Sequence, residues 1–168
     1  MTLPFAMTAP FRIAPLSVIE HATRLVFAQV VQQHPDLFDR LGEHADKRYA
    51  FVPTDLPVGF LVEPSARRIS VHRKPHLPVA QACMGGKLVL LLALLEGQID
   101  GDAVFFSRSL TITGDMEAML ALRNALDDCN IDLPADIARM SGPFAPLVRR
   151  AAAEIRTRAL SREAATWN

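Results

Sequence analysis

The run LVLLLALL at residues 88–95 limits what this chain can fold into more than any other stretch. Eight consecutive apolar residues are less than half of what a membrane-spanning helix needs. A helix that is apolar on every side must instead be covered on all of its faces. Gly85 and Gly86 precede the run and predict a turn, and Gly97 follows Glu96 and predicts the helix end. We therefore expect a helix of about ten residues, buried between other parts of the protein.

The segments around this helix alternate between helical and extended patterns. Residues 17–33 carry apolar side chains at helical spacing on more than one stripe, and Ser17 with Glu20 predicts a capping box. From residue 47 to 85 the sequence reads as short strands separated by prolines: KRYAFVPT, VGFLVE, RRISVHR and PVAQACMG. SLTITGD predicts one more strand, after which Asp115 is placed to cap the amphipathic helix MEAMLALRNALDDC. This order predicts an α+β fold, in which helices are laid on one face of a sheet.

The length and composition suit one folded domain with a segment at each end. A chain of 168 residues with 50% hydrophobic residues can bury a sizeable core. We expect a proline-containing N-terminal arm over residues 1–16, the domain over 17–134 and a basic C-terminal helical segment over 135–168. The arm has no basic opening and does not read as a signal peptide, so a cytoplasmic location is expected.

Charge and cysteine content argue against two classes of protein. Lys+Arg 18 balance Asp+Glu 18, and one Trp and one Tyr offer few platforms for base stacking, so nucleic-acid binding is disfavoured. Cys83 and Cys129 form no CxxC pair and are too few for a disulfide framework, which favours a reducing compartment. We interpret both as small buried hydrophobic residues.

No catalytic constellation is visible in the sequence. The GGK at residues 85–87 lacks the spacing and the Ser or Thr of a phosphate-binding loop, and no nucleophile elbow or dinucleotide fingerprint occurs. His72 and His76 have a metal-ligand spacing, but Pro75 interrupts any helix there and no third ligand is evident nearby. We therefore expect no enzyme activity, no catalytic residue, no metal and no cofactor.

Two adjacent aromatic residues, Phe105 and Phe106, are difficult for one core to accommodate. Neighbouring side chains point to opposite faces of a strand and lie far apart around a helix. We expect one ring to face the ordinary core and the other to face a cavity that holds an apolar molecule. Arg108 follows them and has two interpretations: a surface arginine whose stem covers an aromatic ring, or a guanidinium at the pocket mouth that holds an anionic head group.

The stretch VFFSRSLTITGDMEAMLALRNALD resembles the sterol carrier protein lipid-binding family. More narrowly, with the preceding APFRIAPLSVIEHATRLVFAQ, the chain is similar to the ubiquinone biosynthesis accessory factors of the UbiT group. The resemblance implies a mixed or antiparallel sheet covered by helices that enclose an apolar lipid-binding cavity. It also implies a non-catalytic role in oxygen-independent ubiquinone synthesis, with the UbiU and UbiV proteins as partners and a polyprenyl quinone precursor or a phospholipid as the bound lipid.

The expected cavity lining comes from three segments, although each of these side chains could equally fill an ordinary core. The predicted lipid-binding residues are Leu88, Leu91, Leu92, Leu95, Phe105, Phe106, Met116, Met119 and Leu120. Delivery of a lipid requires contact with a membrane, and the C-terminal segment has apolar residues at helical spacing among its arginines. Arg149, Arg150 and Arg156 are therefore candidates, with Arg108, for head-group or membrane contact at the periphery of the inner membrane. The alternatives are a C-terminal helix packed on the domain, and a protein-interaction module without a lipid cavity.

Overall fold

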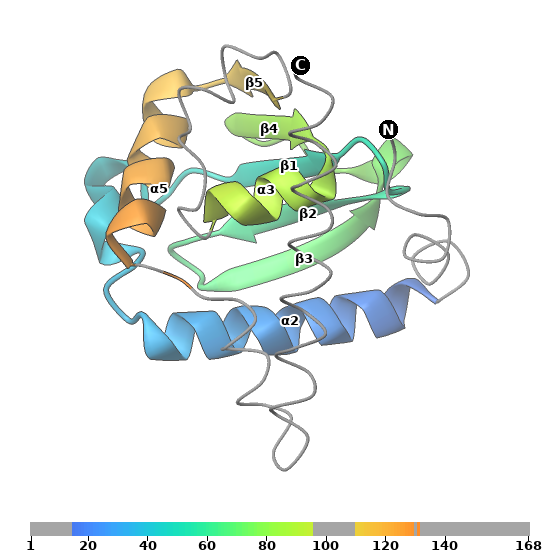
Figure 1. The fold of residues 1–168 in the computed structure, drawn as a ribbon, viewed down its shortest axis with the longest axis horizontal. Coiled ribbons are helices and arrows are strands. Elements are labelled where there is room, and N and C mark those ends of the chain that lie inside the picture. Colours follow the sequence, from blue (N-terminus) through green and yellow to red (C-terminus); the bar gives the residue numbers. More distant parts are fainter. Residues whose placement is uncertain (1–14, 96–109, 130, 132–168) are drawn as a thin grey trace, which may run out of the picture.

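The structure, a computed structural model, describes residues 15–95, 110–129 and 131 (Figure 1). A five-stranded sheet with strand order β3-β2-β1-β4-β5 forms its centre. The pair β1–β4 is parallel and the other neighbouring pairs are antiparallel, which confirms the expected α+β class with a mixed sheet. The strands are β1 (Tyr49–Pro53), β2 (Val58–Glu63), β3 (Arg68–Arg73), β4 (Ala82–Gly86) and β5 (Leu110–Gly114).

Helices form a second layer against this sheet. Figure 1 shows α3 crossing in front of the central strands, with α5 beside it and α2 running along β3. Helix α3 contacts β1, β4 and α5, whereas α2 packs against β3. The helices are α2 (Leu16–Gln33), α3 (Leu88–Leu95) and α5 (Met116–Cys129), with short 3-10 turns η1 (Asp39–His44) and η2 (Lys74–His76). No helix within the described ranges is both long and apolar enough to cross a membrane.

Two predicted element ends are wrong. Helix α2 begins at Leu16 after Pro15, and no side chain caps it, so Ser17 lies inside the first turn and forms no capping box. Gly85 and Gly86 belong to β4 rather than to a turn. Each pairs with β1 on one side and β5 on the other, and these ladder hydrogen bonds outweigh the turn preference of glycine.

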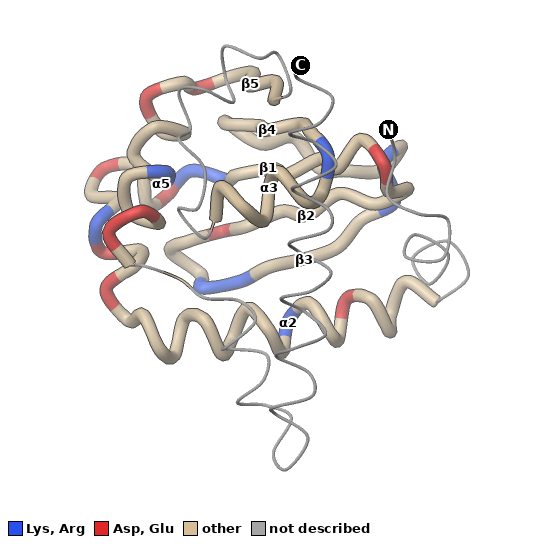
Figure 2. Tube along the Cα trace, viewed as in Figure 1, with Lys and Arg blue, Asp and Glu red and all other residues tan. Residues whose placement is uncertain are grey.

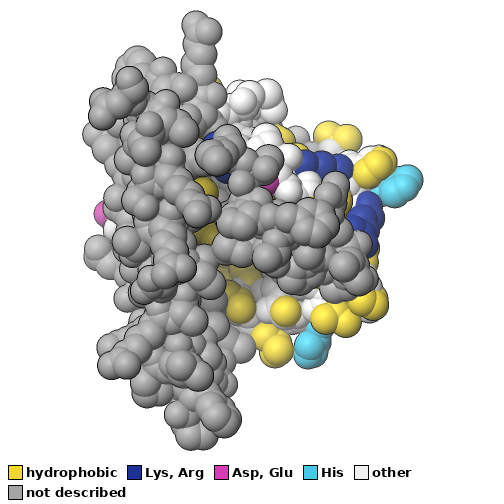
Figure 3. All heavy atoms as spheres, turned by 45° about the vertical axis from the view of Figure 1, so that its right-hand side comes forward, with side chains coloured by type: hydrophobic (Ala, Val, Ile, Leu, Met, Phe, Trp, Pro, Cys, Tyr) yellow, Lys and Arg dark blue, Asp and Glu magenta, His cyan; other side chains and the backbone are white. Residues whose placement is uncertain are grey.

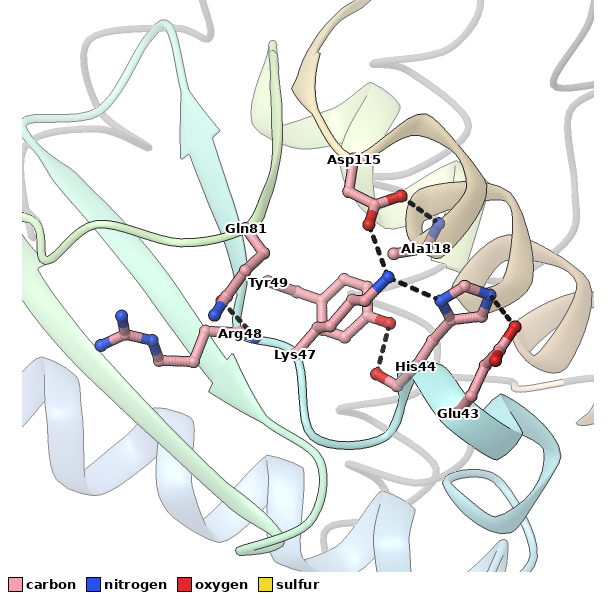
Figure 4. Close-up of polar contacts among 8 residues, drawn as sticks. All are labelled: Glu43, His44, Lys47, Arg48, Tyr49, Gln81, Asp115 and Ala118. Carbon is pink, nitrogen blue, oxygen red and sulfur yellow. Dashed lines mark hydrogen bonds and ion pairs between the residues drawn. The ribbon is translucent and has the colours of Figure 1, made fainter.

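The N-terminus of α5 is built as the sequence predicts. The Asp115 carboxylate accepts a hydrogen bond from the Ala118 amide at 2.9 Å, which satisfies one of the free N–H groups of the first turn. The same carboxylate accepts a hydrogen bond from Lys47 Nζ, and Lys47 also contacts His44 Nδ1 at 3.0 Å (Figure 4). This polar cluster fastens α5 to the segment between η1 and β1.

The fully buried Tyr49 extends this cluster into the core. Its hydroxyl donates to the His44 carbonyl at 2.9 Å (Figure 4). Burial, together with the charge of Asp115, raises the pKa of Tyr49 to about 12, so the hydroxyl stays protonated and keeps donating. The hydrogen bond from the Ala118 amide and the Lys47 ammonium lower the pKa of Asp115. Its ionised form is therefore the one that stabilises the fold, and that contribution is lost as the pH falls through the lowered pKa.

Candidate ligand-binding cavity

A cavity of about 520 Å³ lies between the sheet and the helices α2, α3 and α5. Protein interiors contain few voids larger than a water molecule, and a volume of this size is instead typical of small-molecule sites. The described residues that line it are Val18, Ile19, Ala22, Thr23, Val26, Phe27, Val30, Leu37, Phe38, Phe51, Phe60, Val62, Ile69, Met84, Leu88, Leu91, Leu92, Leu94, Leu95, Met119, Leu122, Arg123, Leu126 and Ile131.

The described part of the lining is almost entirely apolar. Thr23 and Arg123 are the polar side chains among these lining residues, and the Thr23 hydroxyl donates to the Ile19 carbonyl at 2.8 Å. Water gains few hydrogen bonds in such a space, whereas an apolar molecule is transferred into it favourably. The lining residues that the structure describes include no carboxylate, histidine, cysteine or serine. The arrangement is thus suited to holding a hydrocarbon chain and lacks groups for acid–base or nucleophilic chemistry within this part of the wall.

Helix α3 places all four of its predicted residues at the cavity. Leu88, Leu91, Leu92 and Leu95 belong to the lining. The expectation that this helix is covered on every face does not hold, because Leu92 is 41% exposed. The apolar run is tolerated there because one side of the helix borders the cavity and its opening rather than solid protein.

Helix α5 places one of its three predicted residues at the cavity. Met119 is buried and belongs to the lining, but Met116 and Leu120 lie outside it and are 58% and 52% exposed. The face that α5 turns inward is formed by Met119, Leu122 and Leu126. Leu120 follows Met119 by one residue and therefore lies about 100° around the helix from it. Met116 lies four residues before Leu120 and shares its face, so both side chains are turned toward solvent.

The remaining predicted contacts lie outside the described residues: Phe105, Phe106, Arg108, Arg149, Arg150 and Arg156. Their roles stay predictions. The same holds for the N-terminal arm and the C-terminal segment, most of which also lie outside the described ranges.

The sequence reading missed the wall that α2 and the sheet contribute. Val26, Phe27 and Val30 of α2 line the cavity, and the Phe27 ring lies 5.9 Å from the Phe38 ring, centroid to centroid. The strands add Phe51, Phe60, Val62, Ile69 and Met84. The apolar stripe of α2 is wider than contact with one neighbouring element requires. This width is the sequence feature that could have indicated that α2 also lines a cavity.

The cavity lining reaches the surface between α2 and α3. Val18 of α2 and Leu92 of α3 both line the cavity and are 57% and 41% exposed. Figure 3 shows hydrophobic side chains gathered along the lower part of its face, at the height of α2. Exposed apolar side chains that continue into an apolar cavity are what the entrance for a lipid chain requires.

The cysteines do not take part in this site. Neither Cys83 nor Cys129 lines the cavity, and both are free and half-buried. Burial raises the pKa of the Cys129 thiol, which reduces the share of reactive thiolate. Neither is fully buried, contrary to the prediction from the sequence, although Cys129 packs against the hydrophobic core.

Comparison with known proteins gives the family. A search of curated proteins finds no match for this chain. Among solved structures, the chain is similar in fold to the "UbiJ-SCP2 Ubiquinone synthesis protein", with a TM-score of 0.55 and 15% identity, covering 69% of this chain and 94% of that one.

Two further solved structures are sterol carrier proteins. The sterol carrier protein domain 2 of Helicoverpa armigera gives a TM-score of 0.47 at 13% identity, covering 64% of this chain and 88% of that one. The apo form of sterol carrier protein 2 from Yarrowia lipolytica gives 0.46 at 13% identity, covering 64% and 91%. The family model described as the SCP-2 sterol transfer family matches residues 27–127, a span that contains every strand of the sheet, α3 and most of α5. Because this match extends over more than half of the sequence, the chain belongs to the SCP-2 sterol transfer family.

Proposed function

We propose that this protein is a non-catalytic lipid-binding factor that holds or presents the hydrocarbon part of a lipid in the cavity between α2, α3 and α5. The observation that carries the proposal is the volume of about 520 Å³ with an almost wholly apolar wall. Moving ten methylenes from water into it contributes about 8 kcal/mol at ~0.8 kcal/mol each, which corresponds to about micromolar affinity before the costs of association. No covalent chemistry is needed for such binding.

The proposed metabolic pathway rests on similarity to other proteins, because the cavity itself does not identify a pathway. The similar fold of a ubiquinone synthesis protein supports a place in ubiquinone synthesis, and the resemblance to the UbiT group points to the oxygen-independent route. The lipid would then be a polyprenyl quinone precursor or a membrane phospholipid, and UbiU and UbiV would be partners. The protein would act in the cytoplasm, at the periphery of the inner membrane.

Lipid that co-purifies with the protein tests this function directly. We expect an organic-solvent extract of the purified full chain to contain prenylated quinone precursor or phospholipid by mass spectrometry. The protein stripped of this lipid should take up a fluorescent fatty chain from solution. An empty extract together with no uptake would contradict lipid binding and leave a docking role.

A charge at the entrance should slow the uptake of lipid. Leu92→Glu places a carboxylate at the rim, and an apolar chain that passes it must remain close to a hydrated charge. We expect the rate of uptake from vesicles to fall about tenfold while the free energy of unfolding changes by less than ~0.5 kcal/mol, as is usual at exposed positions. Leu120→Glu is the matched control, since Leu120 is also an exposed helical leucine but does not line the cavity. Equal slowing in both variants would argue against an entrance between α2 and α3.

A further inference from the structure

Among the described residues that line the cavity, Arg123 is the only charged one. It lies on α5 between the lining residues Leu122 and Leu126, and its side chain is only 18% exposed. Figure 2 shows that α3 carries no charged residue, whereas charged residues cluster on α5 and η1. The described lining thus includes an arginine on α5, whereas its residues on α2 and α3 are uncharged.

Arg123 forms an ion pair within its own helix. Asp127 lies one turn further along α5, and its carboxylate is 3.5 Å from Arg123 Nε. Asp127 is not among the described lining residues, and its side chain is more exposed than that of Arg123. Placing a charge beside apolar walls costs free energy that a leucine at this position would not. Simple packing of the arginine stem on its neighbours is the alternative explanation.

The position of Arg123 in the cavity lining indicates which part of a bound lipid it would contact. Val18, which lies near the start of α2, and Arg123 on α5 belong to the same lining, and Figure 1 places α5 and the start of α2 on opposite sides of the fold. A lipid whose chain ends at the entrance between α2 and α3 would lie with its chain against these helices and its polar end beside α5. The other polar lining residue, Thr23, already donates its hydroxyl to its own helix.

We propose that Arg123 binds the polar head of the lipid and makes the cavity selective for lipids with an anionic, hydrogen-bond-accepting head. Carboxylate and phosphate both match the planar fork of N–H donors on a guanidinium. This inference rests on the proposed lipid binding and adds to it the class of head group.

Three lipids with the same chain but different heads test the proposal: palmitic acid, cetyl phosphate and cetyl alcohol. Binding is measured by displacement of a fluorescent fatty alcohol, at a pH where the acid is ionised. Arg123→Met keeps the apolar stem and removes the charge. We expect it to weaken binding of the acid and the phosphate by about tenfold and to change binding of the alcohol by less than about twofold.

The matched control is Arg40→Met. Arg40 also pairs with an aspartate of α5, Asp128, at 2.8 Å, but it does not line the cavity. We expect the ratio of acid to alcohol affinity to stay at the wild-type value in this variant. Arg123→Lys keeps the charge without the fork and should fall between wild type and Arg123→Met.

Several outcomes would overturn the proposal. An equal loss for acid, phosphate and alcohol in Arg123→Met would assign Arg123 to packing, and no loss would remove it from the site. Competition of inorganic phosphate with cetyl phosphate would place a free anion, not a lipid head, at Arg123. Wild-type protein that binds acid and alcohol equally well overturns this inference alone, whereas failure to bind any of the three lipids overturns the proposed function with it.

Discussion

Leu91→Trp is expected to remove most lipid binding while the protein stays folded. Leu91 is buried and lines the cavity, so the larger indole can occupy space that is empty in the wild type. A ring that displaces two methylenes of the ligand costs about 1.6 kcal/mol of binding, which is more than tenfold in affinity. The free energy of unfolding should change by less than ~1 kcal/mol because no neighbour is forced aside. Lipid titration and urea unfolding of the same sample measure the two effects.

Leu90→Trp is the matched control for this experiment. Leu90 is the preceding residue on α3 and is also buried, but it does not line the cavity. An indole there must displace packed side chains, and we expect a loss of about 1–3 kcal/mol in the free energy of unfolding. Similar destabilisation by both tryptophans would mean that the space beside Leu91 is as tightly packed as the core. That result would support the docking alternative over lipid binding.

The sequence predicts the type of most elements but places some of their ends wrongly. The spacing of apolar residues distinguishes strands from helices, because inward-facing side chains recur every second residue in a strand and about every 3.6 residues in a helix. The ends depend on pairing with distant segments: Gly85 and Gly86 read as a turn, yet β1 and β5 on either side hold them in β4. A local preference of glycine is small compared with two ladders of backbone hydrogen bonds.

The cavity itself is harder to predict than its individual residues. Hydrophobic periodicity predicts that Val30 faces inward, but a packed core and an open cavity require the same apolar side chains. The prediction that α3 residues line a cavity depends mainly on the resemblance to the sterol carrier protein family, since an all-apolar helix by itself predicts only that the helix is buried. Arg123 belongs by its position to the polar face of an amphipathic helix, and only the tertiary structure shows that it is also one of the lining residues.

Gly114→Ala is expected to destabilise the protein strongly and, by displacing α5, to weaken lipid binding in the cavity. Gly114 has φ +82, where an L side chain is strained, and an added Cβ would lie 2.2 Å from the Gln81 carbonyl oxygen. That oxygen also accepts a hydrogen bond from the Asp115 amide at 2.8 Å, so the clash falls at the junction of β4, β5 and the start of α5. Strain and overpacking together should lower the free energy of unfolding by about 2–4 kcal/mol, measured in urea.

Gly42→Ala separates the two contributions to this loss. Gly42 has φ +53, but no atom lies within 4 Å of the position of its Cβ, so this variant carries backbone strain without the clash. We expect it to lose about 1–2 kcal/mol, less than Gly114→Ala, and to keep wild-type lipid affinity. Gly114→Ala should bind lipid more weakly even where it is fully folded, because displaced α5 residues form part of the cavity wall. Equal losses of stability in the two variants would show that backbone strain alone, and not the contact with Gln81, makes glycine necessary at position 114.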